Sequence, residues 1–220
     1  MDFLKIKILL KRNFCHFLNK SRFLFNNCFG KYKYTFGRDW FYKSEIYQKA
    51  KYILGYKNKN KFEILEIGSF EGLSTTYFID NFLSKLDSKI TSIDPFLLYS
   101  ENDHTTILDH IQIRNFFFNI SKSAYPEKVQ YLGLTSDQFF EINKKKYNFI
   151  YIDGMHTKEQ IPKDIINSWN VLLLNGVIWM DDYLGDNGKL KKTFDTTFDS
   201  LKGEYKVIHR GYQIAIKKLG

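Results

Sequence analysis

The sequence predicts an α/β fold, in which a doubly wound and mostly parallel sheet ends in an antiparallel pair of strands. Short apolar runs alternate with longer amphipathic segments from residue 62 onward, which is the pattern of repeated β-α-β units. The last two apolar runs are separated only by Arg210 and Gly211, as in a hairpin. With 220 residues, 44% of them hydrophobic and 26% charged, the chain can form one domain with a substantial core.

Each element is predicted from local signals along the chain. Ser44 can cap a first helix that Gly55 ends, Pro95 ends the second strand, and Ser136 can cap a later helix. Buried strands are expected from the short apolar runs at residues 62–67, 90–93, 129–132, 148–152 and 177–180. Helices are expected at residues 45–54, 74–86, 104–120, 136–144, 159–173 and 190–201. The closing strands are expected at residues 205–209 and 212–217.

The charge distribution divides the chain into two parts. The formal net charge is +9, and many of the lysines and arginines fall in the first 33 residues. We therefore interpret residues 1–43 as a basic N-terminal extension, a lid or substrate-pocket segment, and residues 44–220 as the domain. A basic surface attracts anions such as nucleic acid, acidic lipid or phosphorylated substrates. The alternative is that these lysines are simply solvated.

Cysteine usage and hydropathy exclude several classes of protein. Cys15 and Cys28 have no metal-site or disulfide-scaffold spacing, so we expect a reducing compartment and a cytoplasmic location. No stretch approaches the ~20 apolar residues that a membrane span requires. Lys5 and Lys7 interrupt the apolar start and no small-residue cleavage site follows, which argues against a signal peptide and leaves an interfacial amphipathic helix open.

A glycine-containing turn follows the first predicted strand. Gly68 and Gly72 are separated by Ser69, Phe70 and Glu71, whereas a dinucleotide fingerprint places its second glycine two residues after the first. Phe70 is bulky and Glu71 would repel a diphosphate. The turn therefore suits a cofactor without phosphate groups, of which S-adenosylmethionine is one, and disfavours a nucleotide-dependent oxidoreductase.

An acidic residue, Asp94, ends the second predicted strand. It lies about 20 residues beyond the glycine turn, where an acid binds ribose hydroxyls in dinucleotide folds. The alternative is that Asp94 caps a turn before Pro95. Taken with the glycine turn, Asp94 indicates a nucleoside cofactor.

Three carboxylates and a histidine follow the fourth and fifth predicted strands. Asp153 and His156 come after one strand, and Asp181 and Asp182 come after the other. Neighbouring strands ~4.8 Å apart would bring the acids together, and such a cluster needs a cation. Oxygen ligands without cysteine predict Mg²⁺ or Ca²⁺, with Mn²⁺ an alternative. Both Asp181 and Asp182 can ligate only if the chain turns there; otherwise they cap a turn, and His156 is an ordinary surface or core histidine.

Four segments together resemble class I methyltransferases, and in particular the macrocin O-methyltransferase group, which includes enzymes that act on sugar hydroxyls. They are residues 66–74, 92–96, 151–156 and 177–183. The resemblance covers about residues 36–217. It implies a Rossmann-like fold, S-adenosylmethionine as cofactor, and methyl transfer to a hydroxyl of a small molecule or sugar.

The resemblance also assigns expected roles to residues. Glu66, Gly68 and Ser69 would contact the methionine part of the cofactor, Asp94 the ribose, and Ser136 the adenine. The full set of expected cofactor-binding residues is Glu66, Gly68, Ser69, Phe70, Gly72, Ser74, Asp94, Pro95, Thr135, Ser136 and Asp153. Asp153, Asp181 and Asp182 would bind Mg²⁺ or Mn²⁺, and the expected catalytic residues are His156, as the base, and Asp153.

Two other functions stay open. A nucleic-acid methyltransferase would suit the net charge, but enzymes of that kind that methylate amino groups carry Pro-Pro-aromatic after the fourth strand, where this chain has Gly154, Met155 and His156. Nucleic acid is therefore not the expected partner. A non-catalytic module that binds the cofactor is the second alternative. A homo-oligomer is compatible with the sequence.

Overall fold

The computed structural model describes residues 33–38, 41, 45–49, 61–84, 87–100 and 105–220. Several expectations lie outside these residues: most of the basic extension with both cysteines, the Ser44 cap, and the end of the first helix at Gly55. Among the described residues, no helix has the length and apolar character needed to cross a membrane.

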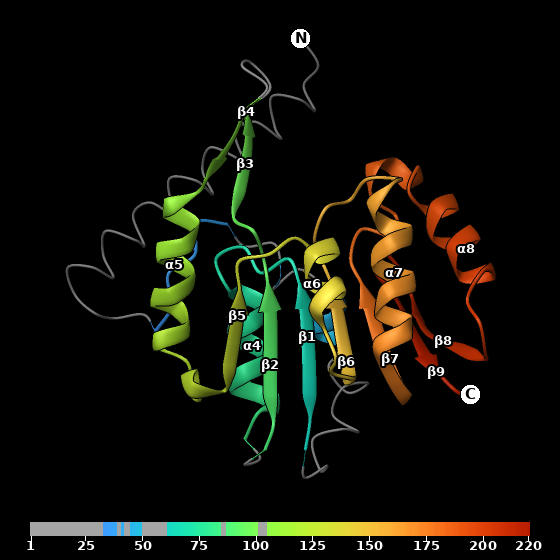
Figure 1. Ribbon diagram of the computed structural model, residues 1–220, viewed down its shortest axis with the longest axis horizontal. Coiled ribbons are helices and arrows are strands. Elements are labelled where there is room, and N and C mark those ends of the chain that lie inside the picture. Colours follow the sequence, from blue (N-terminus) through green and yellow to red (C-terminus); the bar gives the residue numbers. More distant parts are fainter. Residues whose placement is uncertain (1–32, 39–40, 42–44, 50–60, 85–86, 101–104) are drawn as a thin grey trace.

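The fold is a three-layer α/β structure around one twisted sheet, as predicted (Figure 1). The seven strands lie in the order β5-β2-β1-β6-β7-β9-β8. The first five strands of this order are parallel, and β9 is antiparallel to both β7 and β8. The strands are β1 (Glu63–Ile67), β2 (Lys89–Ile93), β5 (Val129–Leu132), β6 (Tyr147–Ile152), β7 (Leu172–Met180), β8 (Tyr205–Arg210) and β9 (Ile214–Lys218).

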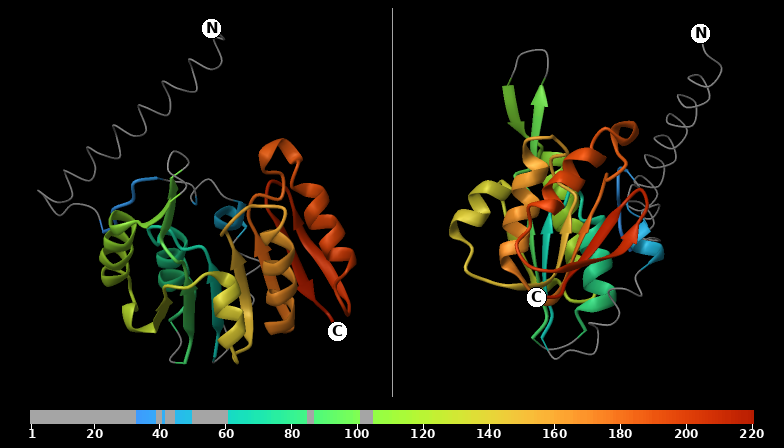
Figure 2. Two further views of the ribbon diagram at one scale, coloured as in Figure 1. Left: turned by 45° about the horizontal axis from the view of Figure 1, so that its top comes forward. Right: turned by 90° about the vertical axis from the view of Figure 1, so that its right-hand side faces the viewer.

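Helices cover both faces of the sheet, and each face has its own apolar core (Figure 2). Alternation along β1 shows the division, because Ile64 packs in one core while Leu65 and Ile67 pack in the other. The first core is covered by α2 (Glu45–Gln48), α4 (Leu73–Phe82) and α5 (His110–Ser121). The second is covered by α6 (Ser136–Ile142), α7 (Gln160–Val171) and α8 (Lys191–Asp199).

The predicted helix over residues 104–120 is wrong in its first part. Residues 105–108 form strand β4 (Thr105–Leu108), which pairs antiparallel with β3 (Leu97–Ser100) in a hairpin that projects from the edge of the domain (Figure 1). The helix α5 begins only at residue 110, because the Asp109 carboxylate accepts the N–H groups of Ile111 and Gln112 as an N-cap.

Other boundaries differ by a few residues. The helix predicted to be capped by Ser136 is capped instead by Thr135, whose hydroxyl accepts the N–H of Gln138 in a capping box. Strand β7 starts at Leu172 rather than at 177. The predicted pairing of the fourth and fifth strands is confirmed, because β6 and β7 run parallel with Ile152 opposite Met180. This pairing brings the two acidic segments to one edge of the sheet.

Candidate functional site

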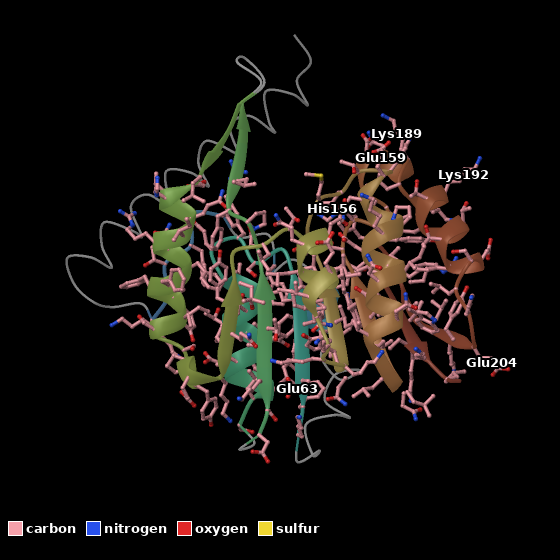
Figure 3. The ribbon with its side chains drawn as sticks, viewed as in Figure 1. Glu63, His156, Glu159, Lys189, Lys192 and Glu204 are labelled. Carbon is pink, nitrogen blue, oxygen red and sulfur yellow. The ribbon has the colours of Figure 1, made fainter. Side chains whose placement is uncertain are left out.

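A cavity of about 1030 Å³ opens at the carboxyl ends of β1, β2, β6 and β7. His156 lies at this edge of the sheet, between the β3–β4 hairpin and α7 (Figure 3). Most of the predicted site residues line the cavity, namely Gly68, Ser69, Phe70, Ser74, Asp94, Pro95, Thr135, Ser136, Asp153, His156, Asp181 and Asp182. Glu66 and Gly72 do not.

The turn after β1 is held close to the end of β6. Gly68 has a φ of 85°, and a Cβ there would lie 2.0 Å from the carbonyl oxygen of Asp153, so only glycine fits. Gly72, with a φ of 81°, is the N-cap of α4. Ser69 lies between them, and its hydroxyl is buried at the cavity. A buried hydroxyl of this kind is suited to bind a ligand.

Asp94 connects β2 to this turn. Its Oδ2 accepts the N–H groups of Ser69 and Phe70, both at 2.9 Å, and its Oδ1 accepts the N–H of Phe96 at 2.7 Å. Asp94 therefore caps the turn before and after Pro95, as one of the two expectations for it stated. A carboxylate has about four acceptor sites, so one remains for a ribose hydroxyl.

Glu66 lies beneath the turn rather than in the cavity lining. It is fully buried and accepts the hydroxyls of Ser74 at 2.5 Å, Thr75 at 2.5 Å and Ser92 at 2.8 Å. Burial raises the pKa of Glu66, and the hydroxyl hydrogen bonds oppose this shift. Glu66 therefore joins β1, α4 and β2 beneath the turn, and the structure does not place it against a cofactor as the sequence predicts.

The carboxylates of Asp153, Asp181 and Asp182 gather around His156 and Tyr151. The Nε2 atom of His156 is 3.3 Å from Asp153 Oδ1 and 3.2 Å from Asp182 Oδ2. The Tyr151 hydroxyl is 3.2 Å from Asp153 Oδ2 and 3.3 Å from Asp181 Oδ2. Asp182 has a φ of 54°, so the chain turns directly after β7 and both of its acids face the same site.

The crowding of these acids changes their proton affinity. Burial raises the pKa of Asp153 to about 7; the Asp181 and Asp182 charges also raise it, while His156 opposes the shift. Burial alone would lower the pKa of His156, but its hydrogen bond with Asp153 and the surrounding carboxylates raise it above the ordinary value. Asp153 and His156 therefore form a coupled acid–imidazole pair, in which the charge of each group changes the proton affinity of the other.

The structure does not show the predicted magnesium or manganese site. Among the described residues, no three acidic, histidine or cysteine side chains form a group that could hold a metal ion. Each oxygen of the three carboxylates lies near a protein partner. Besides the contacts given above, Asp181 Oδ1 accepts the Asp182 N–H at 2.8 Å, and Asp182 Oδ1 accepts the Tyr212 hydroxyl. The His156 ring lies between two of the acids, where the sequence predicts a cation.

Several cavity residues had no signal in the sequence. Gln160 donates to the Ser136 hydroxyl at 2.9 Å and to Asp137 at 3.1 Å, on the side predicted to hold the adenine. Tyr212 reaches the cavity from the turn between β8 and β9. Arg38 and Phe41 reach it from the segment before α2. Such residues are separated widely along the chain, so only the fold brings them to the site.

The sequence profile of methyltransferase family 24, described as a methyltransferase domain, matches residues 65–183. The chain belongs to this family. The matched residues span the sheet from β1 to the turn after β7 and include the glycine turn, Asp94 and the Asp153–His156 segment. The prediction of a class I S-adenosylmethionine-dependent methyltransferase is therefore confirmed at the level of family and fold.

Solved structures with the same fold support this assignment. An O-methyltransferase from Bacillus cereus, in complex with SAH, is 15% identical with a TM-score of 0.58, over 82% of this chain and 84% of that one. The O-methyltransferase TomG from Streptomyces achromogenes, in complex with SAM, is 12% identical with a TM-score of 0.56, over 78% and 79%. An rRNA methylase from Streptococcus thermophilus is 10% identical with a TM-score of 0.55, over 81% and 98%. No curated protein matches the chain.

Proposed function

We propose that this methyltransferase transfers a methyl group from S-adenosylmethionine to a hydroxyl oxygen of a small molecule or sugar, with His156 as the base. The observation that supports this most is the convergence of the glycine turn, Asp94 and the Asp153–His156 pair on one cavity. These three features come from different strands, and each matches a separate requirement of the reaction.

The cavity fits S-adenosylmethionine in shape and charge. Gly68 lines the cavity, and the Ser69 hydroxyl and the free acceptor site of Asp94 can supply polar contacts to the cofactor. Five of the lining residues are acidic: Asp94, Asp137, Asp153, Asp181 and Asp182. This favours the cationic sulfonium and ammonium groups. When bound, the cofactor supplies an electrophilic methyl group.

His156 is placed to remove the acceptor's proton. The acceptor's hydroxyl proton would move to Nδ1 of His156, because Nε2 faces the carboxylates of Asp153 and Asp182. The Asp153 and Asp182 carboxylates, 3.3 and 3.2 Å away, stabilise the imidazolium that results. Positioning of the acceptor in the cavity supplies much of the remaining rate.

The proposed mechanism uses no divalent cation, since no three acidic, histidine or cysteine side chains among the described residues form a group that could hold one. We expect methyl transfer to persist after exhaustive dialysis against EDTA. Loss of activity that Mg²⁺ or Mn²⁺ restores would show that these side chains rearrange around a cation, as the sequence predicts.

The acceptor is tested by transfer of labelled methyl groups. The full-length protein is incubated with methyl-tritiated S-adenosylmethionine and with separate small-molecule, glycan and RNA fractions of cells. We expect label in the small-molecule or glycan fraction, and a ~10²-fold smaller rate with His156→Gln. Label in RNA would instead favour the nucleic-acid methyltransferase, and cofactor binding without transfer to any fraction would favour a non-catalytic module.

A further inference from the structure

The charges that line the cavity are unevenly distributed. Against five acidic lining residues, Arg38 is the only lysine or arginine that lines the cavity in the described part of the chain. S-adenosylmethionine carries two cationic groups, which the acids suit, but it also carries an α-carboxylate. A cationic partner would stabilise this carboxylate in the acidic cavity, since like charges in a partly desolvated site weaken binding.

The segment that carries Arg38 is fastened to the helices beside the cavity. Thr35 donates its N–H to the Asn119 side chain and accepts from it, both at 2.8 Å, so residues 33–38 lie along α5 (Figure 2). The Gly37 N–H donates to Glu71, whose carboxylate is also held by Asn115 at 2.7 Å. Because a Cβ at Gly37 would lie 3.0 Å from Glu71 Oε1, the absence of a side chain permits this close approach.

These contacts fix Arg38 beside the glycine turn. Glu71 belongs to that turn, three residues after Gly68, and its partner Gly37 directly precedes Arg38. On the other side, Phe41 is buried against Phe78 and Tyr151, with ring centroids 5.9 and 6.0 Å apart, and it also lines the cavity. Arg38 thus lines the cavity from a segment that is fastened to the glycine turn.

We propose that Arg38 binds the α-carboxylate of the cofactor's methionine group. This inference rests on the proposed function. The guanidinium presents two parallel N–H groups to a carboxylate, a geometry that lysine does not reproduce. Glu71 and Asn119 act as positioning residues, because they hold the segment from which Arg38 extends.

The test compares two ligands that differ only in the carboxylate. Binding of S-adenosylhomocysteine and of its decarboxylated analogue, S-adenosyl-3-thiopropylamine, is measured by calorimetry on the full-length protein. We expect Arg38→Ala to weaken binding of S-adenosylhomocysteine by ~10- to 100-fold, the range for a charge-assisted hydrogen bond, and to leave binding of the analogue unchanged. Arg38→Lys should lose part of this affinity.

The control is Arg210→Ala, which removes the same charge from an exposed residue of β8 that does not line the cavity. It should leave both affinities unchanged. Equal weakening of both ligands by Arg38→Ala, or unchanged affinity for S-adenosylhomocysteine, would overturn the inference while the proposed function stands. Absence of S-adenosylhomocysteine binding by the unsubstituted protein would overturn both.

Discussion

At the scale of single residues, the site uses carboxylates whose surroundings differ. Glu66 is fully buried among hydroxyls, Asp94 accepts backbone N–H groups, and Asp153 shares its site with other acids and with His156. Burial and, to a smaller extent, the charges of the neighbouring carboxylates raise the pKa of Asp153 to about 7. Glu66 and Asp94 therefore hold the glycine turn and the elements beneath it, while we propose that Asp153 supports proton transfer to His156.

Replacing His156 with Gln should separate binding from chemistry. Gln retains a polar side chain, so affinity for S-adenosylhomocysteine should be unchanged while turnover falls by ~10²-fold or more. In the unsubstituted protein, activity should rise with pH as His156 loses its proton, at a pH above that of an ordinary histidine because its pKa is raised. The variant should lack this limb of the profile. A rate profile of unchanged shape would assign the base to another group.

Replacing Glu66 with Ala should reduce stability. The change leaves the buried hydroxyls of Ser74, Thr75 and Ser92 without their acceptor. We expect the free energy of unfolding in urea to fall by ~2–4 kcal/mol. The control Ser74→Ala, which removes one donor, should cost only ~1 kcal/mol. If the two variants are equally stable, Glu66 does not join the three elements as described.

At the scale of elements, the short helix α2 is fastened to the β8–β9 hairpin. Glu45 Oε2 is 2.8 Å from His209 Nε2 and accepts the N–H of Gln213 at 2.7 Å. The Gln213 side chain in turn accepts the Ile46 N–H and the indole N–H of Trp179. The turn of this hairpin carries Tyr212, whose hydroxyl donates to Asp182. Docking of α2 therefore supports one wall of the site.

This docking should depend on pH. Burial raises the pKa of Glu45. The hydrogen bonds with His209 and Gln213 and the charge of His209 outweigh this effect, so the pKa of Glu45 in the folded protein is lowered. A carboxyl group whose pKa is lowered by folding stabilises the folded state at pH values above its pKa in the unfolded chain. This stabilisation disappears as the pH falls through its pKa in the folded protein. Glu45→Gln should thus lower Tm at neutral pH, with the difference from the unsubstituted protein vanishing below about pH 4.

The control for this prediction is Glu204→Gln, which neutralises an exposed acid with no side-chain ion pair recorded among the described residues (Figure 3). It should leave Tm almost unchanged. A Tm difference for Glu45→Gln that is independent of pH would show that the carboxylate's charge does not hold α2 in place.

Some elements could be predicted from the local sequence and others could not. The buried parallel strands were predictable, because two-sided burial requires short apolar runs such as residues 129–132. The β3–β4 hairpin was not, because residues 105–108 continue the apolar spacing of the helix that follows, and only pairing with Leu97–Ser100 selects the strand. The Asp109 cap was the available signal that the helix begins at residue 110.

At the scale of the whole molecule, the mostly parallel sheet and the position of the site at its carboxyl edge followed from the sequence, while the contacts within the site did not. The alternation of elements predicts parallel pairing, so the ends of β6 and β7 had to meet. The partners of each carboxylate depend on residues far away in the chain, such as Tyr212 for Asp182 and Ser92 for Glu66. For this reason the sequence did not predict that His156 lies between two of the acids, or that Glu66 is buried beneath the cavity lining.

We expect the cavity at the carboxyl edge of the sheet to bind S-adenosylmethionine. Calorimetric titration of the full-length protein with S-adenosylhomocysteine tests it most directly, with NAD as the matched nucleotide control. We expect one site with a Kd in the micromolar range, about −8 kcal/mol, no binding of NAD, and strong weakening by Asp94→Ala, which removes the acid that holds the glycine turn. Binding of NAD without binding of S-adenosylhomocysteine would contradict the account.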